Sequence, residues 1–457
     1  MTWPYHGAVR AVFTILGVLL SLTAVRADPP PRPMLEETTA SERDVLGRML
    51  TSRSWARRAI GAMRLERYGC DASKDALVEL LADDAWQVRA FSIRSLGRRR
   101  IAADESWFAD EAEPRVLRTA LRHRYSLEAE RLERGVTRLA ERRNVDERML
   151  GVELGAASGD PELESIARET LRSVILRMDR RQAGALSPRI AAVTGKRGIR
   201  RAHNWQTWLL KAGRSFEVRP AFTIPAGDDP LVPAGLPALD TERFTRLEDY
   251  MSTLHDRRID LAICLDTTAS MSGELAEAQA GLDDLMVFAA DVVSEFRVAI
   301  VAYRDARSRY QTRWWDFTSS IDEARGHLWS LAANGGGDTP ESVSAAMRDA
   351  FTNLVWLDDH VKVLIVIGDA PPHPGTGAHC ITMAKRARHG ADVTTHVIQT
   401  EDVDVKHFPE IAEAGEGRCV SLTDDDALIP EVTGLTLGGA FEEEMRDFFA
   451  AYLELCR

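Results

Sequence analysis

Apolar residues recur with helical spacing over the first half of the chain, and the pattern repeats. The segment that starts at Trp55 returns about 31 residues later at Trp86, and fainter copies follow near Pro114 and Asp146. Self-similarity at such a period is typical of stacked helical pairs. One pair cannot bury its own apolar stripe, so neighbouring pairs must stack. The pattern therefore predicts an all-α helical repeat region over residues 41–182.

From Ile259 onward the period changes, and short apolar runs alternate with amphipathic helical segments. The expected strands are residues 259–265, 296–303, 314–317, 361–367 and 393–399. The expected helices are residues 273–293, 321–331, 341–354 and 376–389. Near-continuous apolar strands that alternate with helices form a mostly parallel sheet covered on both faces. We expect a doubly wound, Rossmann-like α/β domain over residues 257–423 and a helical extension over residues 424–457.

The pattern breaks between these two regions. Trp205 and Trp208 flank a short segment that we expect to pack on the end of the repeats, and a proline- and glycine-rich stretch follows it. Such composition is typical of a linker. Residues 183–256 are therefore predicted to be a linker region, and the chain is predicted to be multidomain.

The first residues have the features of an export signal. Arg10 precedes an apolar run over residues 11–25, and Val25 and Ala27 place small residues at the −3 and −1 positions of a cleavage site. The run is shorter than the roughly 20 apolar residues that span a membrane. We expect residues 1–27 to be a signal peptide and the protein to be exported to the periplasm, the cell surface or the medium. The alternative is an uncleaved N-terminal anchor, the one case in which we expect a membrane to be a partner.

Composition and charge narrow the class of protein. A hydrophobic fraction of 45% is typical of globular domains. The formal net charge of −12 argues against general nucleic-acid binding, and the arginine-rich stretch over residues 53–143 is interpreted as solvated helix faces. The five cysteines form no zinc-like spacing and define no disulfide framework.

Carboxylates follow two of the expected buried strands. Asp266 comes directly after one strand, and Asp369 follows the strand that starts at residue 361. Thr268 and Ser270 alternate after Asp266, so their hydroxyls and its carboxylate can turn toward one point. Ligands of a parallel sheet bind at the carboxyl ends of its strands. Carboxylate and hydroxyl oxygens are hard ligands, which suit Mg²⁺, Mn²⁺ or Ca²⁺ rather than zinc.

A glycine-rich loop supplies further oxygens. Three glycines precede Asp338 and Thr339, and glycine permits tight turns and close backbone approach. Pro340 then suits the first turn of a helix. Either Asp338 or Thr339 is a candidate ligand, and the residues alone do not decide between them.

The order of four segments resembles the von Willebrand factor type A family. These segments read DLAICLDTTASM, VAIVAYRD, GGGDTPES and VLIVIGDAPPH. The resemblance implies a metal-ion-dependent adhesion site whose ligands would be Asp266, Thr268, Ser270 and Asp369, with Asp338 at a position where many members have threonine. It also implies a protein partner whose carboxylate completes the metal's coordination. The segment DDAWQVRAFSIRSLG, in the first half, resembles HEAT-like repeats of the short bacterial kind.

The sequence bears on three classes of function. We expect an exported, metal-dependent protein-binding or adhesion module on a helical-repeat scaffold. The alternative is a structural or assembly scaffold whose metal site is silent or absent. A hydrolase is not expected, because Ser270 lies outside a G-x-S-x-G elbow and the histidines form no H-E-x-x-H motif.

Export is tested by N-terminal sequencing of the protein purified from its own cells. Cleavage after Ala27 would leave Asp28 as the first residue. An intact Met1 in a soluble cytoplasmic fraction would contradict export, whereas an intact Met1 in the membrane fraction would favour the anchor.

Overall fold

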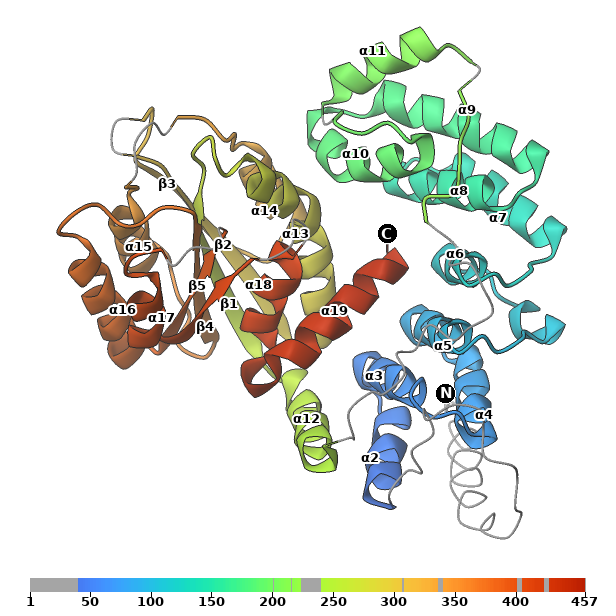
Figure 1. Cartoon of the computed structure of the whole chain (residues 1–457), viewed down its shortest axis with the longest axis horizontal. Coiled ribbons are helices and arrows are strands. Elements are labelled where there is room, and N and C mark those ends of the chain that lie inside the picture. Colours follow the sequence, from blue (N-terminus) through green and yellow to red (C-terminus); the bar gives the residue numbers. More distant parts are fainter. Residues whose placement is uncertain are drawn as a thin grey trace, which may run out of the picture. The chain divides into compact units, whose positions relative to one another are not determined.

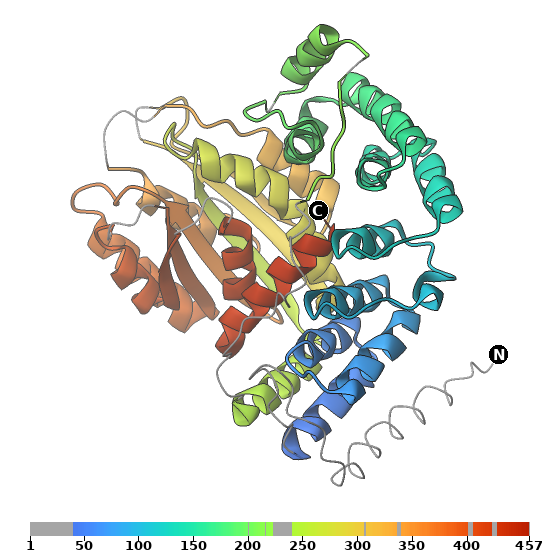
Figure 2. The same cartoon turned by 45° about the vertical axis from the view of Figure 1, so that its right-hand side comes forward.

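The structure is a computed structural model, and it comprises two compact units. It describes residues 40–199, 201–214, 216–222, 240–305, 308–335, 340–400, 405–422 and 427–456. The first unit comprises Met1–Ser252 and Tyr452–Arg457, and the second comprises Thr253–Ala451 (Figures 1 and 2). The expected export signal lies outside the described residues. No helix among the described residues is long and apolar enough to cross a membrane.

The first unit is helical. Its helices are α2 (Ala40–Leu50), α3 (Trp55–Leu65), α4 (Asp71–Glu79), η1 (Leu80–Ala82), α5 (Trp86–Arg98), η2 (Glu105–Phe108), α6 (Pro114–Arg122), α7 (Ala129–Ala140), α8 (Val145–Ala157), α9 (Pro161–Arg177), α10 (Arg180–Thr194), α11 (Ala202–Ala212) and α12 (Thr241–Leu254). Helix α3 packs on α5, α5 on α6, α7 on α8 and α8 on α9. This succession is consistent with the predicted helical repeats.

Two arginines at equivalent positions of the sequence repeat make equivalent bonds. Arg58 of α3 donates to the Asp83 carboxylate at 2.6 Å and to the Ser52 carbonyl at 2.8 Å. Arg89 of α5 donates to the Glu111 carboxylate at 2.7 Å and to the Asp83 carbonyl at 2.8 Å. Each arginine thus ties its own helix to the loop that precedes the next repeat, so the sequence repeat is also a repeat of interactions.

Helical packing continues past residue 182, where the sequence pattern predicted the start of the linker region. Helix α10 includes Pro188 within its length. The side chain of Trp205 is fully buried, and its indole N–H donates to the Ser187 hydroxyl at 2.9 Å. Phe216 and Val218 join the same core. The proline- and glycine-rich residues 223–239 lie outside the described residues.

The second unit is an α/β sandwich around a six-stranded sheet. Its strands are β1 (Arg258–Asp266), β2 (Glu295–Tyr303), β3 (Thr312–Thr318), β4 (Val361–Gly368), β5 (Val393–Gln399) and β6 (Glu416–Ser421). Its helices are α13 (Ser272–Val292), α14 (Ile321–Trp329), α15 (Val343–Thr352), α16 (Gly377–Ala391), α17 (Phe408–Ala414), α18 (Leu428–Leu437), η3 (Gly439–Phe441) and the start of α19 (Glu442–Cys456). The strand order is β3-β2-β1-β4-β5-β6, and all neighbours are parallel except β3 and β2.

Helices cover both faces of this sheet, so the doubly wound, Rossmann-like fold class is confirmed. Helices α15, α16 and α17 bury one face together with alternate residues of β1, β2, β4 and β5. Helix α13 contacts β2, and both α14 and α18 pack against α13 (Figure 1). Strand β6 and helix α17 were not predicted, because β6 is short and only partly buried and therefore carries little apolar signal. All five cysteines lie among the described residues, and none of them takes part in a disulfide.

A buried carboxylate at the amino end of β1 ties three segments of the second unit together. The Asp260 side chain is fully buried and accepts from Arg297 at 2.8 and 2.6 Å. It also contacts His360 Nδ1 at 2.7 Å and accepts from the Leu357 backbone N–H at 3.0 Å. Asp260 therefore joins β1 to β2 and to the segment that enters β4.

We predict that Asp260→Asn lowers the free energy of unfolding by about 3–5 kcal/mol, because it leaves the Arg297 charge without its carboxylate in a buried site. Urea unfolding of the full chain measures this change. Asp359→Asn is the matched control, since Asp359 pairs with Arg258 at the surface and its side chain is 61% exposed. Equal stability of the two variants would contradict this account of the fold.

Candidate metal site

Two carboxylates meet at the carboxyl edge of the sheet. Strands β1 and β4 are parallel neighbours, and Leu265 lies opposite Ile367. Asp266 is the last residue of β1, and Asp369 follows Gly368 at the end of β4. The two strands therefore deliver both acidic residues to the same edge, as the sequence pattern predicted.

The hydrogen bonds of Asp266 leave one of its oxygens without a partner. Asp266 is fully buried, and its Oδ1 accepts from the Thr268 backbone N–H and hydroxyl, both at 2.8 Å. The Thr268 hydroxyl in turn lies 3.2 Å from the Ser270 hydroxyl. Oδ2 of Asp266 is buried and has no hydrogen-bond partner among the described residues. A buried carboxylate oxygen without a partner costs free energy unless a cation or a proton compensates it.

Burial raises the pKa of Asp266 to about 7. The Thr268 hydrogen bonds act in the opposite direction, the negative charge of Asp369 raises the pKa further, and the Arg304 guanidinium lowers it. Loss of hydration is the largest of these effects, and the second carboxylate adds to it. Both effects disfavour a negative charge on Asp266 in the metal-free protein.

Gly368 permits the close approach of β4 to this corner. A Cβ atom at residue 368 would overlap the Tyr303 hydroxyl and lie 3.6 Å from Asp266 Oδ2. The Tyr303 hydroxyl donates to the Ile367 carbonyl at 3.0 Å. A side chain at residue 368 would therefore displace the buried tyrosine, which supports the end of β4 beside Asp266.

The glycine-rich loop is described only at its two flanks. Asp338 and Thr339, the remaining candidate ligands, lie outside the described residues. On one side, the Asn334 N–H donates to the Thr267 carbonyl, and the Gly335 carbonyl accepts from the Ala269 N–H, both at 3.1 Å. Gly335 has a φ of 77°, which fits its predicted role in a tight turn.

On its other side, the loop is attached to the segment after β4. The Glu341 N–H donates to the Pro371 carbonyl at 3.0 Å. The described flanks thus join this loop to the loop of Thr268 and to the loop of Asp369. The described flanks of the glycine-rich loop therefore lie at the same edge of the sheet as the loops of Thr268 and Asp369.

Arg304 holds two of these loops together, a role that the sequence did not reveal. It is buried, and its Nε donates to both the carbonyl and the hydroxyl of Thr267 at 3.1 Å. Its Nη2 donates to the Ala332 carbonyl, and the guanidinium lies 4.3 Å from the centre of the Tyr310 ring. The signal was its position directly after β2, since a residue there reaches the same edge of the sheet as Asp266.

The donor set fits a hard divalent cation better than a soft one. No group of three or more His, Cys, Asp or Glu side chains converges among the described residues in a way that could hold a metal. The converging donors in this region are instead Asp266 with two hydroxyl groups, beside Asp369. Carboxylate and hydroxyl oxygens are ligands for Mg²⁺, Mn²⁺ or Ca²⁺. Among these donors, Oδ2 of Asp266 is buried without a hydrogen-bond partner in the described structure, so a cation would stabilise it most.

The family model that matches this chain describes the von Willebrand factor type A domain and covers residues 260–434. Residues 260–434 form a von Willebrand factor type A domain. The match runs beyond residue 423, the predicted end of the domain, and ends within α18.

Other proteins resemble only part of the chain. A protein of Acanthamoeba polyphaga mimivirus, described as an ariadne-like RING finger protein, is 33% identical over 121 residues, which are 26% of this chain and 12% of that protein. The solved structure of BatB from Bacteroides thetaiotaomicron is 15% identical and covers 43% of this chain and 99% of its own, with a TM-score of 0.30. A von Willebrand factor type A structure from Catenulispora acidiphila is 18% identical, with a TM-score of 0.30. The match covers 43% of this chain and 42% of that chain.

A serine, a histidine and an aspartate lie close together in the type A domain, but not as a hydrolase triad. His373 Nε2 lies 3.5 Å from the Ser342 hydroxyl and 3.6 Å from Asp305 Oδ1. A triad uses both ring nitrogens, one for the nucleophile and one for the carboxylate. Here both contacts involve the same nitrogen, so the group does not position a general base between the two.

The raised pKa of Asp266 predicts how the stability of the metal-free type A domain depends on pH. Between about pH 4 and pH 7 the folded protein keeps a proton on Asp266 that the unfolded chain has released. The contribution of Asp266 to the free energy of unfolding therefore falls as pH rises, by up to about 1.4 kcal/mol per pH unit, and is constant above pH 7.

Urea unfolding in EDTA at several pH values tests this prediction. Asp266→Asn should be more stable than the wild type at pH 8, and the difference should shrink toward pH 4. Asp359→Asn, at the opposite edge of the sheet, should follow the wild-type profile. Parallel wild-type and Asp266→Asn curves would show that the Asp266 carboxylate is not destabilised by its surroundings.

Proposed function

We propose that the type A domain binds a divalent metal through Asp266, Thr268, Ser270 and Asp369, with Asp338 or Thr339 as a further ligand. We propose further that the bound metal recognises a protein partner. The unit would then act as a binding or adhesion module rather than as an enzyme. The helical repeats would serve as its scaffold.

The observation that supports this proposal most strongly is the buried, partnerless Oδ2 of Asp266. Its burial, together with the nearby charge of Asp369, makes an ionised Asp266 unfavourable in the metal-free protein. A divalent cation would remove both penalties, because it would replace the lost hydration and screen the repulsion between the carboxylates. The hydrogen bonds from Thr268 are made to Oδ1 and leave the buried Oδ2 available to a cation.

Mg²⁺ is the favoured ion, with Mn²⁺ and Ca²⁺ as alternatives. Mg²⁺ loses water reluctantly and is usually bound by one or two carboxylates while it keeps other ligands exchangeable. Such a metal would offer a Lewis-acidic position to an oxygen of the partner. The residues of this chain would hold the metal, and the partner would complete its coordination.

The charge at residue 338 bears on the chemistry of that partner. With Asp266 and Asp369 alone, two negative charges would balance the cation, and a partner carboxylate would still be attracted. A direct contact from Asp338 would add a third negative charge. A neutral or backbone oxygen of the partner would then compete better with a carboxylate than it does in members that carry threonine there.

A structural scaffold with a silent metal site is the second candidate. It is favoured by the bonds of Arg304, which tie the Thr267 and Ala332 loops together without any metal. Because these bonds already join the two loops, a metal is not needed to hold the loops together. A buried carboxylate oxygen with no partner is then better explained by binding than by structural support.

The proposed setting is outside the cytoplasm. The N-terminal pattern of Arg10, an apolar run and Val25-x-Ala27 supports export. An uncleaved anchor would instead leave the module on the membrane. Nucleic acid is not proposed as a partner, because the net charge of −12 would repel it.

We predict that Asp266→Ala abolishes Mg²⁺ binding while the domain stays folded. The remaining hydroxyls of Thr268 and Ser270 are neutral and cannot displace water from Mg²⁺ by themselves. Loss of one of two repelling carboxylates should not unfold the metal-free protein. Titration calorimetry of the full chain with Mg²⁺, Mn²⁺ and Ca²⁺ measures the affinity, and circular dichroism checks the fold.

Two further variants sharpen this test. Asp359→Asn removes one negative charge at the opposite edge of the sheet and should bind metal as the wild type does. Asp338→Thr should bind an acidic partner more tightly if Asp338 contacts the metal. Unchanged Mg²⁺ affinity in Asp266→Ala would rule out the site as described.

A further inference from the structure

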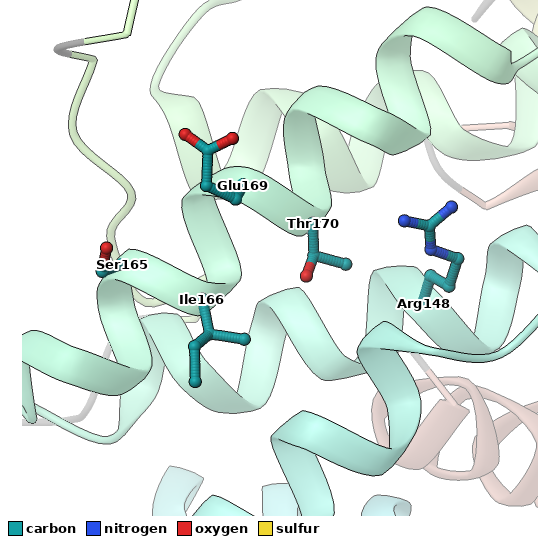
Figure 3. A pocket seen from close by; sticks show the side chains of 5 residues that line it. All are labelled: Arg148, Ser165, Ile166, Glu169 and Thr170. Carbon is teal, nitrogen blue, oxygen red and sulfur yellow. The ribbon is translucent and has the colours of Figure 1, made fainter.

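A second candidate binding site lies in the helical unit, between α8 and α9. A pocket of about 380 Å³ is lined by Arg148 of α8 and by Ser165, Ile166, Glu169 and Thr170 of α9 (Figure 3). Figure 3 shows the side chains of Arg148 and Thr170 projecting into the space between the two helices. The metal site plays no part in this pocket, which belongs to the other unit.

Arg148 is buried, and no described carboxylate pairs with it. The residue is 9% exposed, and its buried Nε has no hydrogen-bond partner among the described residues. Burial lowers the pKa of Arg148, and the positive charge of Arg177 lowers it further. The Nε of this guanidinium has lost hydration that no group in the described part of the unit replaces.

Other buried arginines differ from Arg148 in this respect. Arg118, 3% exposed, pairs with the buried carboxylate of Glu153, and Arg94, 9% exposed, pairs with Glu66 at 3.2 Å. Each of these arginines is neutralised where it is buried. Arg148 is therefore an exception to the way in which this unit accommodates buried arginines.

Glu169, the acidic residue of the pocket, does not neutralise Arg148. Its side chain is 64% exposed and lies 3.5 Å from Arg172 on the same helix. Figure 3 shows its carboxylate pointing away from Arg148. The pocket thus holds one uncompensated positive charge at its wall and one paired negative charge at its rim.

We propose that this pocket binds the side-chain carboxylate of a glutamate or aspartate of a protein partner, with Arg148 as its anchor. The planar guanidinium matches a carboxylate in shape and donates two parallel hydrogen bonds to it. The hydroxyls of Ser165 and Thr170 are further donors, and Ile166 offers an apolar wall to the ligand's methylene groups. The negative charge of Glu169 at the rim disfavours a doubly charged phosphate.

Fluorescence anisotropy of the full chain in EDTA tests this proposal, because the chelator keeps the metal site out of the measurement. The probe is a fluorescein-labelled peptide in which glutamates alternate with glycines, and the same peptide with glutamines or phosphoserines is the comparison. We expect the wild type to prefer the glutamate peptide to both. Arg148→Met should weaken its binding about tenfold or more, the size expected for a charge-assisted hydrogen bond.

Arg134→Met is the matched control, because Arg134 lies on α7 with a side chain that is 67% exposed. It should bind the glutamate peptide within about twofold of the wild type, since an exposed surface charge contributes little. Arg148→Met should also unfold at the same temperature as the wild type or a higher one, because it removes a buried charge that has no partner.

Three results would overturn the proposal. Equal affinity for the glutamate and glutamine peptides, including no measurable affinity for either, would show that no carboxylate site exists. Tighter binding of the phosphoserine peptide would assign the pocket to phosphate. An unfolding temperature several degrees lower in Arg148→Met would show that Arg148 serves the fold through a partner within the chain.

Discussion

One buried carboxylate at the end of β1 is the constraint around which the carboxyl edge of the second unit is built. Asp266 is fully buried, one of its oxygens is bound by Thr268, and the other is buried without a partner among the described residues. A folded domain carries this cost at the mouth of its sheet, beside a second acidic residue. The simplest physical reason for such an arrangement is a bound cation, because the cation would compensate the buried charge and gain binding free energy from it.

The surrounding structure keeps that carboxylate in place without a metal. Gly368 lets β4 approach Asp266, the Tyr303 hydroxyl bonds to the end of β4, and Arg304 ties the first loop to the segment before the glycine-rich loop. At the opposite edge of the sheet, Asp260 joins β1, β2 and the entry to β4. The strand that presents Asp266 is therefore fixed at both ends, so the oxygen donors are preorganised for a ligand.

Much of this was predictable from the sequence, and the exceptions have physical reasons. Buried strands carry a continuous apolar signal, so the sheet and the strand ends at Asp266 and Asp369 could be predicted from residue pattern alone. The roles of Arg304 and Tyr303 could not be, because they depend on contacts between residues distant in sequence. The helical unit continues past residue 182, because the buried Trp205 packs into the same core as the preceding helices. Asp338 and Thr339 lie outside the described residues, so the choice between them is still a prediction.

The central claim is that the type A domain recognises a protein partner through a bound divalent metal. Its most direct test is affinity capture from the native cell-envelope fraction by the immobilised full chain, with Mg²⁺ or with EDTA, alongside Asp266→Ala and Asp359→Asn. The account predicts a partner that Asp359→Asn and the wild type retain in Mg²⁺, that EDTA releases, that restored Mg²⁺ recovers, and that Asp266→Ala fails to capture. Recovery of the same proteins by all three chains, with or without Mg²⁺, would contradict it.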